Sequence, residues 1–345
     1  MIYFNNDYSE GCHEKVLSRL IETNMAQSLG YGEDEYCAAA AARIRAKCGR
    51  EDIAVHFLVG GTQANLTVID AALRPHQGAL GPDTAHINVH ETGAVEATGH
   101  KVLWVPHQDG KITAAQVAET VHAHRTNGAT EHTVQPKLVY ISNPTELGTL
   151  YTLAELEELS QTCRELGLYL FLDGARLGSA LTARDNDLTP ADISALTDAF
   201  YIGGTKNGAL FGEALVLVND DAKSHFRWII KQQGAMLAKG WLLGLQFQEL
   251  LRDDLYFELA RHANRTAETL AEGIAALGHP FAWTPQSNQL FPILPRRTAE
   301  RLASLGYAFR IDHAVDDAHV CIRLVTSWAT PEDAVRAFLE DLARA

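Results

Sequence analysis

Residues 199–208 read Ala-Phe-Tyr-Ile-Gly-Gly-Thr-Lys-Asn-Gly, and the rest of the chain can be interpreted around the lysine in this stretch. The apolar residues 199–202 are typical of a short strand, which leads directly into two glycines, a threonine and Lys206. A lysine held by a tight turn at a strand end is fixed in direction and poorly solvated, so it can form a Schiff base. The ordinary alternative is a solvated surface charge.

A second stretch, residues 168–176, reads Leu-Tyr-Leu-Phe-Leu-Asp-Gly-Ala-Arg and favours a chemical role for Lys206. Its continuous apolar run suits a parallel strand that is buried on both faces. Asp173 then lies at the carboxyl end of a strand, where open α/β sheets bind ligands. Pyridoxal phosphate (PLP) requires a lysine for its aldehyde and an acid for its pyridine nitrogen. Lys206 and Asp173 supply that pair, which predicts a PLP site.

Composition limits the classes of partner and the cellular location. The chain has 345 residues and a net charge of −14, which argues against nucleic acid or an anionic membrane as the main partner. No apolar run approaches the length of a membrane span. Five scattered cysteines form no Cys-x-x-Cys motif, which is typical of reduced thiols and predicts a cytoplasmic protein.

Strand-like and helix-like segments alternate through most of the chain. This alternation predicts an α/β fold with a mostly parallel sheet covered by helices. The expected strands are 85–89, 101–105, 137–142, 169–173, 199–202 and 214–218. We expect an N-terminal arm (1–12), a large cofactor-binding domain (13–250) and a small C-terminal α/β domain (251–345).

Assembled in order, several short motifs resemble those of the threonine aldolases, which are fold-type I PLP enzymes with a seven-stranded sheet of this kind. The segments that carry the resemblance are 4–8, 31–34, 61–66, 85–93, 173–176, 205–206 and 323–326. They extend over nearly the whole chain. Each motif is weak to moderate alone, but the shared order and spacing make the combination strong.

The resemblance implies roles in cofactor binding. Lys206 binds the aldehyde of PLP, and Asp173 keeps the pyridine nitrogen protonated. Gly61 and Thr62 open a helix whose backbone N–H groups can hold the phosphate, and Thr205 adds a hydroxyl. An ordinary turn is the alternative for the glycine pair before Thr62.

Further residues are expected at the substrate. His86 stacks on the cofactor ring and contributes to catalysis, a satisfied core histidine being the alternative. Arg176 and Arg323 are planar donors suited to carboxylates, and Arg176 is also expected at the cofactor. Asn6 adds a contact from the N-terminal arm. His86 and His90 are four residues apart, but two ligands are too few for a zinc site, so no metal is expected.

The chain also departs from the family pattern. The loop after the strand near residue 141 contains Glu146 and lacks the histidine that the family often carries there, so Glu146 or His86 is the candidate base. Tyr31 and Lys239 correspond to family segments that reach the active site of a neighbouring subunit. The resemblance therefore implies a homodimer or homotetramer with shared active sites.

The sequence thus predicts an aldolase that cleaves β-hydroxy-α-amino acids, such as L-threonine, L-allo-threonine or phenylserine, to glycine and an aldehyde. A β-eliminating lyase or an aminotransferase on the same fold is the alternative, because both use the same lysine and aspartate. A PLP-binding carrier without turnover is a rival of another class. The β-substituent, the threo or erythro preference, the base and the dimer or tetramer state are left open.

Overall fold

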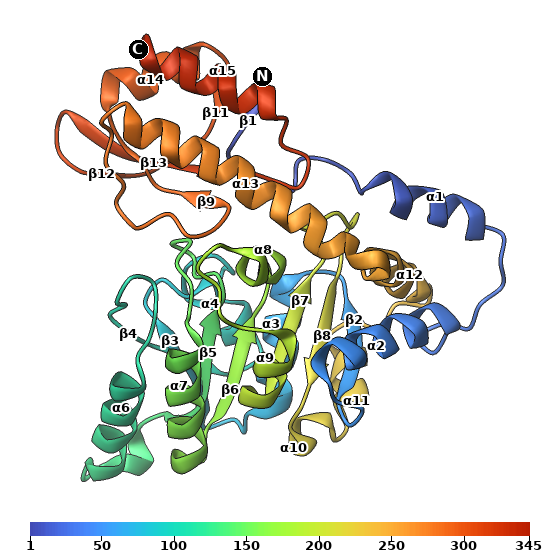
Figure 1. Cartoon of the computed structure of the whole chain (residues 1–345). Coiled ribbons are helices and arrows are strands. Elements are labelled where there is room, and N and C mark those ends of the chain that lie inside the picture. Colours follow the sequence, from blue (N-terminus) through green and yellow to red (C-terminus); the bar gives the residue numbers. More distant parts are fainter.

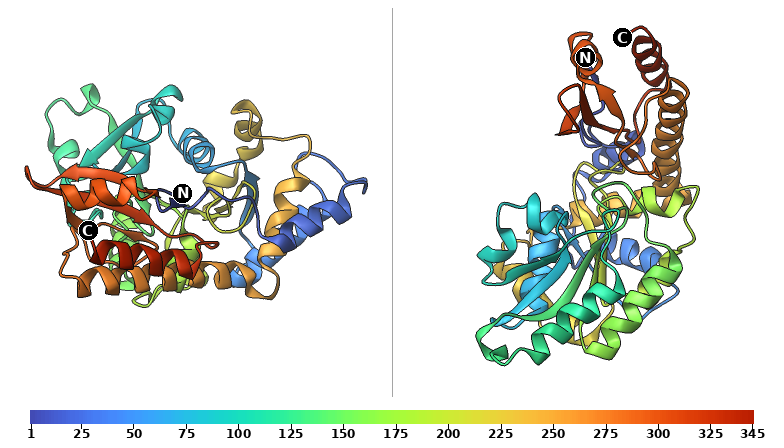
Figure 2. Two further views of the ribbon diagram at one scale, coloured as in Figure 1. Left: turned by 90° about the horizontal axis from the view of Figure 1, so that it is seen from above. Right: turned by 90° about the vertical axis from the view of Figure 1, so that its left-hand side faces the viewer.

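The computed structural model describes residues 1–345, which form a large lobe around a seven-stranded sheet and a smaller lobe above it (Figures 1 and 2). Across the large sheet the strands follow the order β2-β8-β7-β6-β5-β3-β4. Their bounds are Ala54–Leu58 (β2), Gln77–Pro82 (β3), Lys101–Val105 (β4), Gln135–Ser142 (β5), Tyr169–Asp173 (β6), Ala199–Gly203 (β7) and Glu213–Leu217 (β8).

Strand direction in this sheet is almost uniform. The pairs from β4 through β3, β5 and β6 to β7 are all parallel, whereas β8 runs antiparallel to both β7 and β2. The predicted mostly parallel sheet is therefore confirmed. Parallel pairing brings the carboxyl ends of β5, β6 and β7 to one edge, with Ser142 opposite Asp173 in the register.

Helices cover both faces of the sheet, which explains the continuous apolar strands. In β6, Leu170 and Leu172 belong to the core on one face and Phe171 to the core on the other. The first face is covered by α2 (Glu35–Cys48), α6 (Ala114–Thr126), α7 (Leu153–Leu166), α8 (Leu177–Thr182), α9 (Pro190–Leu196) and α12 (Trp241–Leu250). The second is covered by α3 (Gly61–Ala72), α4 (His86–Val89), α5 (Ala94–Ala97), α10 (Asp220–Lys223) and α11 (Phe226–Gln232).

The smaller lobe has its own core of 17 buried residues. It consists of β1 (Ile2–Tyr3), α13 (Leu255–Ala276), β9 (Gln289–Leu290), β10 (Ile293–Pro295), α14 (Arg296–Ser304), β11 (Tyr307–Ala308), β12 (Arg310–Ala314), β13 (His319–Val325) and α15 (Glu332–Ala343). The N-terminal strand β1 pairs with β11, so the arm lies with the C-terminal segment although the two are far apart in sequence (Figure 1). The boundary at 250/251 stays a prediction.

One expected strand is wrong. Residues 86–89 form the short helix α4, and the strand of this region is β3, which lies before α4 in the chain at Gln77–Pro82. The apolar residues Ile87 and Val89 alternate as in a strand, but only Ile87 is buried, whereas Val89 is half exposed. In contrast, β3 contains Gly78 and Gly81, which weakened its sequence signal.

Candidate active site

Asp173 ends β6, and its buried carboxylate accepts four hydrogen bonds. The Tyr201 hydroxyl and the Ala175 N–H donate to Oδ1 at 2.5 and 3.0 Å. The Tyr140 hydroxyl and the Asn65 amide donate to Oδ2 at 2.5 and 3.0 Å. Donors from four separate segments therefore hold this carboxylate in one orientation.

These surroundings favour the charged form of Asp173. Burial by itself raises the pKa of a carboxyl group, but the charge of His86 and the hydroxyls of Tyr140 and Tyr201 outweigh it, so the pKa of Asp173 is lowered. An ionised, immobile carboxylate at the end of a central strand is suited to accept a hydrogen bond from a protonated ring nitrogen.

Lys206 follows β7 and lies in the same charged neighbourhood. Burial is the main reason that the pKa of Lys206 is lowered, and the charge of Arg176 acts in the same direction. The acids Asp7, Asp173 and Glu213 oppose this shift. A lower pKa leaves more of the amine neutral, which is the form that attacks an aldehyde.

The hydroxyl of Thr205 is already bonded within the protein. It donates to Glu213 Oε1 at 2.9 Å and accepts the Gly212 N–H at 2.9 Å. Its predicted contact with a phosphate therefore has to compete with two internal hydrogen bonds, and the role stays a prediction.

The first turn of α3 supplies backbone donors close to Asp173 and to the two tyrosines, Tyr140 and Tyr201, that donate to it. Gly61 and Thr62 begin this helix, where the N–H groups have no partner within the helix and the dipole favours an anion. A Cβ at Gly61 would lie 2.8 Å from the Tyr201 hydroxyl. A glycine at this position therefore keeps the helix end close to the hydroxyl that bonds Asp173.

His86 is linked to Asp173 through two polar side chains. His86 Nδ1 lies 2.7 Å from Glu91 Oε1, and the Asn65 amide donates to the same oxygen at 2.7 Å. Asn65 also donates to Asp173, so a continuous chain of hydrogen bonds joins the histidine to the aspartate. Glu91 thereby fixes the imidazole ring from its Nδ1 side.

Glu146 lies directly beside His86. Its Oε1 accepts the Ser142 hydroxyl at 2.7 Å and the backbone N–H of His86 at 3.1 Å. Burial raises the pKa of Glu146, and the charge of Asp173 raises it further, against the lowering effect of the Ser142 hydrogen bond. A carboxylate with a raised pKa is a stronger base than an ordinary glutamate when it is ionised.

Arg176 forms a forked ion pair that the sequence did not predict. Its Nε and NH2 donate to the two oxygens of Asp7 at 2.6 and 3.1 Å, and Asn288 donates to Asp7 at 3.0 Å. Asn6, the predicted substrate contact from the arm, accepts from the Tyr8 N–H within its own turn, and its contact with the substrate stays a prediction. Two donors of Arg176 are thus occupied by a carboxylate of the protein itself.

Arg323, in contrast, has unused donors. Its NH2 donates to Gln289 Oε1 at 2.5 Å, while its Nε is buried without a partner. Burial and the charge of Arg176 lower the pKa of Arg323 to about 10. A buried, incompletely paired guanidinium fits the carboxylate of an amino acid. Together with Asp173, Lys206 and the α3 terminus, this set of side chains fits PLP and an amino-acid substrate.

Comparison with known proteins assigns the family. The family model described as beta-eliminating lyase matches residues 8–294. The chain belongs to the beta-eliminating lyase family. The low specificity L-threonine aldolase of Pseudomonas aeruginosa is 31% identical over 99% of this chain and 96% of its own length. That of Escherichia coli K12 is 27% identical over 89% of both chains.

Solved structures agree with this assignment. A structure described as Leishmania major threonine aldolase superposes with a TM-score of 0.97 and 49% identity, covering 100% of this chain and 99% of its own. The aspartate aminotransferase of Thermus thermophilus shares the fold alone, with a TM-score of 0.73 and 19% identity over 100% and 91% of the two chains. The predicted fold-type I architecture is therefore confirmed, and enzymes of this family and fold depend on PLP in general.

Tyr31 and Lys239, which are predicted to reach the cofactor of a neighbouring subunit, lie at the surface of the single chain. Tyr31 is 46% exposed, and its N–H donates to the Ala238 carbonyl at 3.3 Å. Lys239 is exposed as well. The hydrogen bond places Tyr31 next to the residue that precedes Lys239. Their role at the cofactor of a neighbouring subunit stays a prediction.

Several side chains of the cluster were not predicted from the sequence as site residues. They are Asp7, Asn65, Glu91, Tyr140, Tyr201, Glu213 and Gln289. Asn65 and Glu91 stood inside motifs that were noted without a role. The two tyrosines carried a usable signal, because a hydroxyl within an apolar central strand needs a buried partner.

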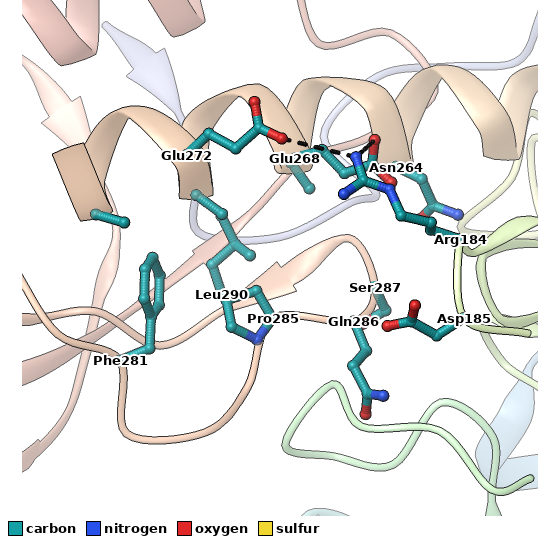
Figure 3. A pocket seen from close by; sticks show the side chains of 13 residues that line it. Arg184, Asp185, Asn264, Glu268, Glu272, Phe281, Pro285, Gln286, Ser287 and Leu290 are labelled. Carbon is teal, nitrogen blue, oxygen red and sulfur yellow. Dashed lines mark hydrogen bonds and ion pairs between the residues drawn. The ribbon is translucent and has the colours of Figure 1, made fainter.

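A cleft of about 280 Å³ between α13 and residues 281–290 contains none of the predicted site residues (Figure 3). Arg184 points towards Glu268 and Glu272 on α13, at 3.1 and 3.6 Å. Arg184, Glu268 and Glu272 thus form an ion-pair group at this cleft, apart from the predicted site residues. The structure also contains no helix with the length and apolar content needed to cross a membrane.

Proposed function

We propose that this chain is a PLP-dependent aldolase that cleaves β-hydroxy-α-amino acids of the L-threonine type to glycine and an aldehyde. The family match, the named relatives and the fit of the cluster to the cofactor support this proposal. Bound PLP supplies an electron sink for the electron pair that remains on Cα when the Cα–Cβ bond breaks.

The residues of the chain divide the remaining tasks. Lys206 binds the cofactor aldehyde, and Asp173 accepts a hydrogen bond from the ring nitrogen and stabilises its positive charge. The first turn of α3 binds the phosphate. Arg323 binds the α-carboxylate of the substrate with its unused donors and thereby fixes Cα near Lys206.

The observation that carries the choice of aldol cleavage is the position of Glu146. Its carboxylate has a raised pKa and contacts the backbone of His86, so it can accept the proton of the β-hydroxyl directly or through a water. Loss of that proton turns the hydroxyl into the aldehyde oxygen as the Cα–Cβ bond breaks. Glu91 holds the Nδ1 side of His86, which leaves the other ring nitrogen available to the substrate or the cofactor.

An assay of products tests this proposal. The purified protein, with PLP present, is given L-threonine, L-allo-threonine or phenylserine. Glycine and aldehyde in equal amounts are the expected products. A β-eliminating lyase, which the family description favours as the second candidate, would release ammonia and a 2-oxo acid instead. Transamination would consume an added 2-oxo acid and leave the carbon chain intact.

The assembly and location that we propose are a cytoplasmic homodimer or homotetramer with shared sites. Helix α1 (Glu14–Thr23) and the loop after it expose Leu17, Ile21, Met25 and Leu29, each at least 49% accessible in the single chain. An exposed apolar surface of this kind supports contact with another copy. The five cysteines are all free, which supports a reducing compartment.

A further inference from the structure

Glu213 is a buried carboxylate that has no role in the steps described so far. It is the first residue of β8 and only 4% exposed. In the antiparallel register it pairs with Gly203, the last residue of β7. Lys206 is three residues further along the chain, so Glu213 lies at the base of the turn that presents the lysine.

The carboxylate of Glu213 holds the two residues that precede Lys206. The Gly204 N–H donates to Oε2 at 3.0 Å, and the Thr205 hydroxyl donates to Oε1 at 2.9 Å. The N–H groups of both residues also donate to the Gly212 carbonyl, at 3.0 and 3.1 Å. Each carboxylate oxygen therefore fixes one residue of the turn.

Charge adds a second link between Glu213 and Lys206. Burial raises the pKa of Glu213 to about 8, although Lys206 and the hydrogen bonds from Thr205 and Gly204 act against that rise. The other titratable groups that face Glu213 are Asp173 and the hydroxyls of Tyr201 and Tyr256. Among these groups Lys206 is the cation. A negative charge on Glu213 therefore favours the protonated form of the Lys206 nitrogen.

We propose that Glu213 is the positioning residue of Lys206, which it directs by holding Gly204 and Thr205 and whose bound proton it stabilises through its charge. This inference rests on the proposed cofactor role of Lys206. Glu213 acts on the cofactor only through the lysine. Two effects follow, one on the geometry of cofactor binding and one on the proton of the Lys206 nitrogen.

Two substitutions separate these effects. Glu213→Gln removes the charge but can still bond the turn, because its carbonyl accepts the Gly204 N–H and its amide can donate to the Thr205 oxygen. Glu213→Ala removes both. Glu249→Gln on α12 is the matched control, since Glu249 is also a buried glutamate, with Arg252 as its ion-pair partner.

The readouts are a pH titration of the absorbance of the bound cofactor and the Kd for PLP. In Glu213→Gln the titration midpoint is expected to fall by about one pH unit, because the charge of Glu213 no longer favours the proton on the Lys206 nitrogen, while Asp7 and Asp173 still do. Its Kd should stay close to wild type. In Glu213→Ala the Kd is expected to rise by roughly tenfold or more, because the hydrogen bonds to the carboxylate are lost. The control should match wild type in both.

A wild-type midpoint in Glu213→Gln overturns the inference, because a purely structural carboxylate would leave that midpoint in place. The titration of Glu213→Gln tests the proposal even if Glu213→Ala does not fold. A wild-type protein that shows no lysine-bound cofactor absorbance would instead overturn the proposed function. The two failures are therefore distinguishable.

Discussion

Arg323 has donors free for a substrate, whereas two donors of Arg176 are occupied by Asp7. We predict that Arg323→Ala raises KM for L-threonine by tenfold or more, on the order expected for a lost bidentate contact to a carboxylate. Arg323→Lys should recover part of the loss, because a lysine provides charge without the fork. Cofactor absorbance should persist in both variants, which steady-state kinetics and a spectrum would check.

Arg310 provides a control for this substitution. It pairs with Arg323 in the strand register but is exposed. Arg310→Ala should leave KM within about twofold of wild type. An unchanged KM in Arg323→Ala would assign carboxylate binding to another residue.

The raised pKa of Glu146 predicts how activity depends on pH. A base must be ionised, so kcat/KM should fall as the pH is lowered through a value above that of an ordinary glutamate. Glu146→Gln should reduce kcat by about 100-fold and remove this acidic limb. A pH–rate profile of both proteins is the measurement. If the limb persisted in Glu146→Gln, the titrating base would be another group, with His86 the first to substitute.

Helices α12 and α2 pack closely at Gly244, where the backbone of α12 approaches the backbone of α2 at Cys37. A Cβ there would lie 2.5 Å from the Cα of Cys37. Gly244→Ala is therefore expected to destabilise the fold by about 1–3 kcal/mol through overpacking. Gly128→Ala is the control, because a Cβ at that position would have no atom of another residue within 4 Å beyond its chain neighbours. Denaturant unfolding would measure both, and equal stabilities would contradict the close approach.

The elements of the large lobe were largely predictable, but their pairing was not. The ends of helix α7 carry clear sequence signals, with a capping box between Thr152 and Glu155 and a glycine at position 167. Strands β6 and β7 were predictable from their continuous apolar runs, because a strand that is buried on both faces is apolar at every position. In contrast, the local sequence gives no clear sign of the break between α12 and α13 at residues 251–254, where Asp253 and Asp254 adopt positive φ.

Site residues were predictable only where the local sequence around them indicates a chemical role. Asp173 was found because it ends an apolar strand before a glycine, and Lys206 because it follows an apolar strand and two glycines. Asp7 was not found, because its partner Arg176 is 169 residues away and only the folded arm brings them together. The same reason applies to Tyr140, whose partner Asp173 lies on the neighbouring strand β6, 33 residues further along the chain.

For the whole molecule, we predict that the active site is shared between two chains. Tyr31 and Lys239 are exposed in the single chain and lie next to each other. A mixture of an inactive Lys206→Ala chain and an inactive Tyr31→Ala/Lys239→Ala chain should recover about one quarter of wild-type activity after random exchange. Half of the dimers are then mixed, and each has one intact site.

Mass measurement of the mixed dimers controls for exchange. If exchange were complete and no activity returned, the sites would not be shared. Full activity of the Tyr31→Ala/Lys239→Ala chain alone would also contradict the prediction.

The most direct test of the central claim is to identify which lysine binds the cofactor. The purified protein is incubated with PLP, reduced with borohydride, digested and mapped by mass spectrometry. We predict that the pyridoxyl group is found on Lys206 and that Lys206→Ala carries no label at a stoichiometric level. Stoichiometric label on any other lysine would contradict the assignment of Lys206 as the cofactor-binding residue.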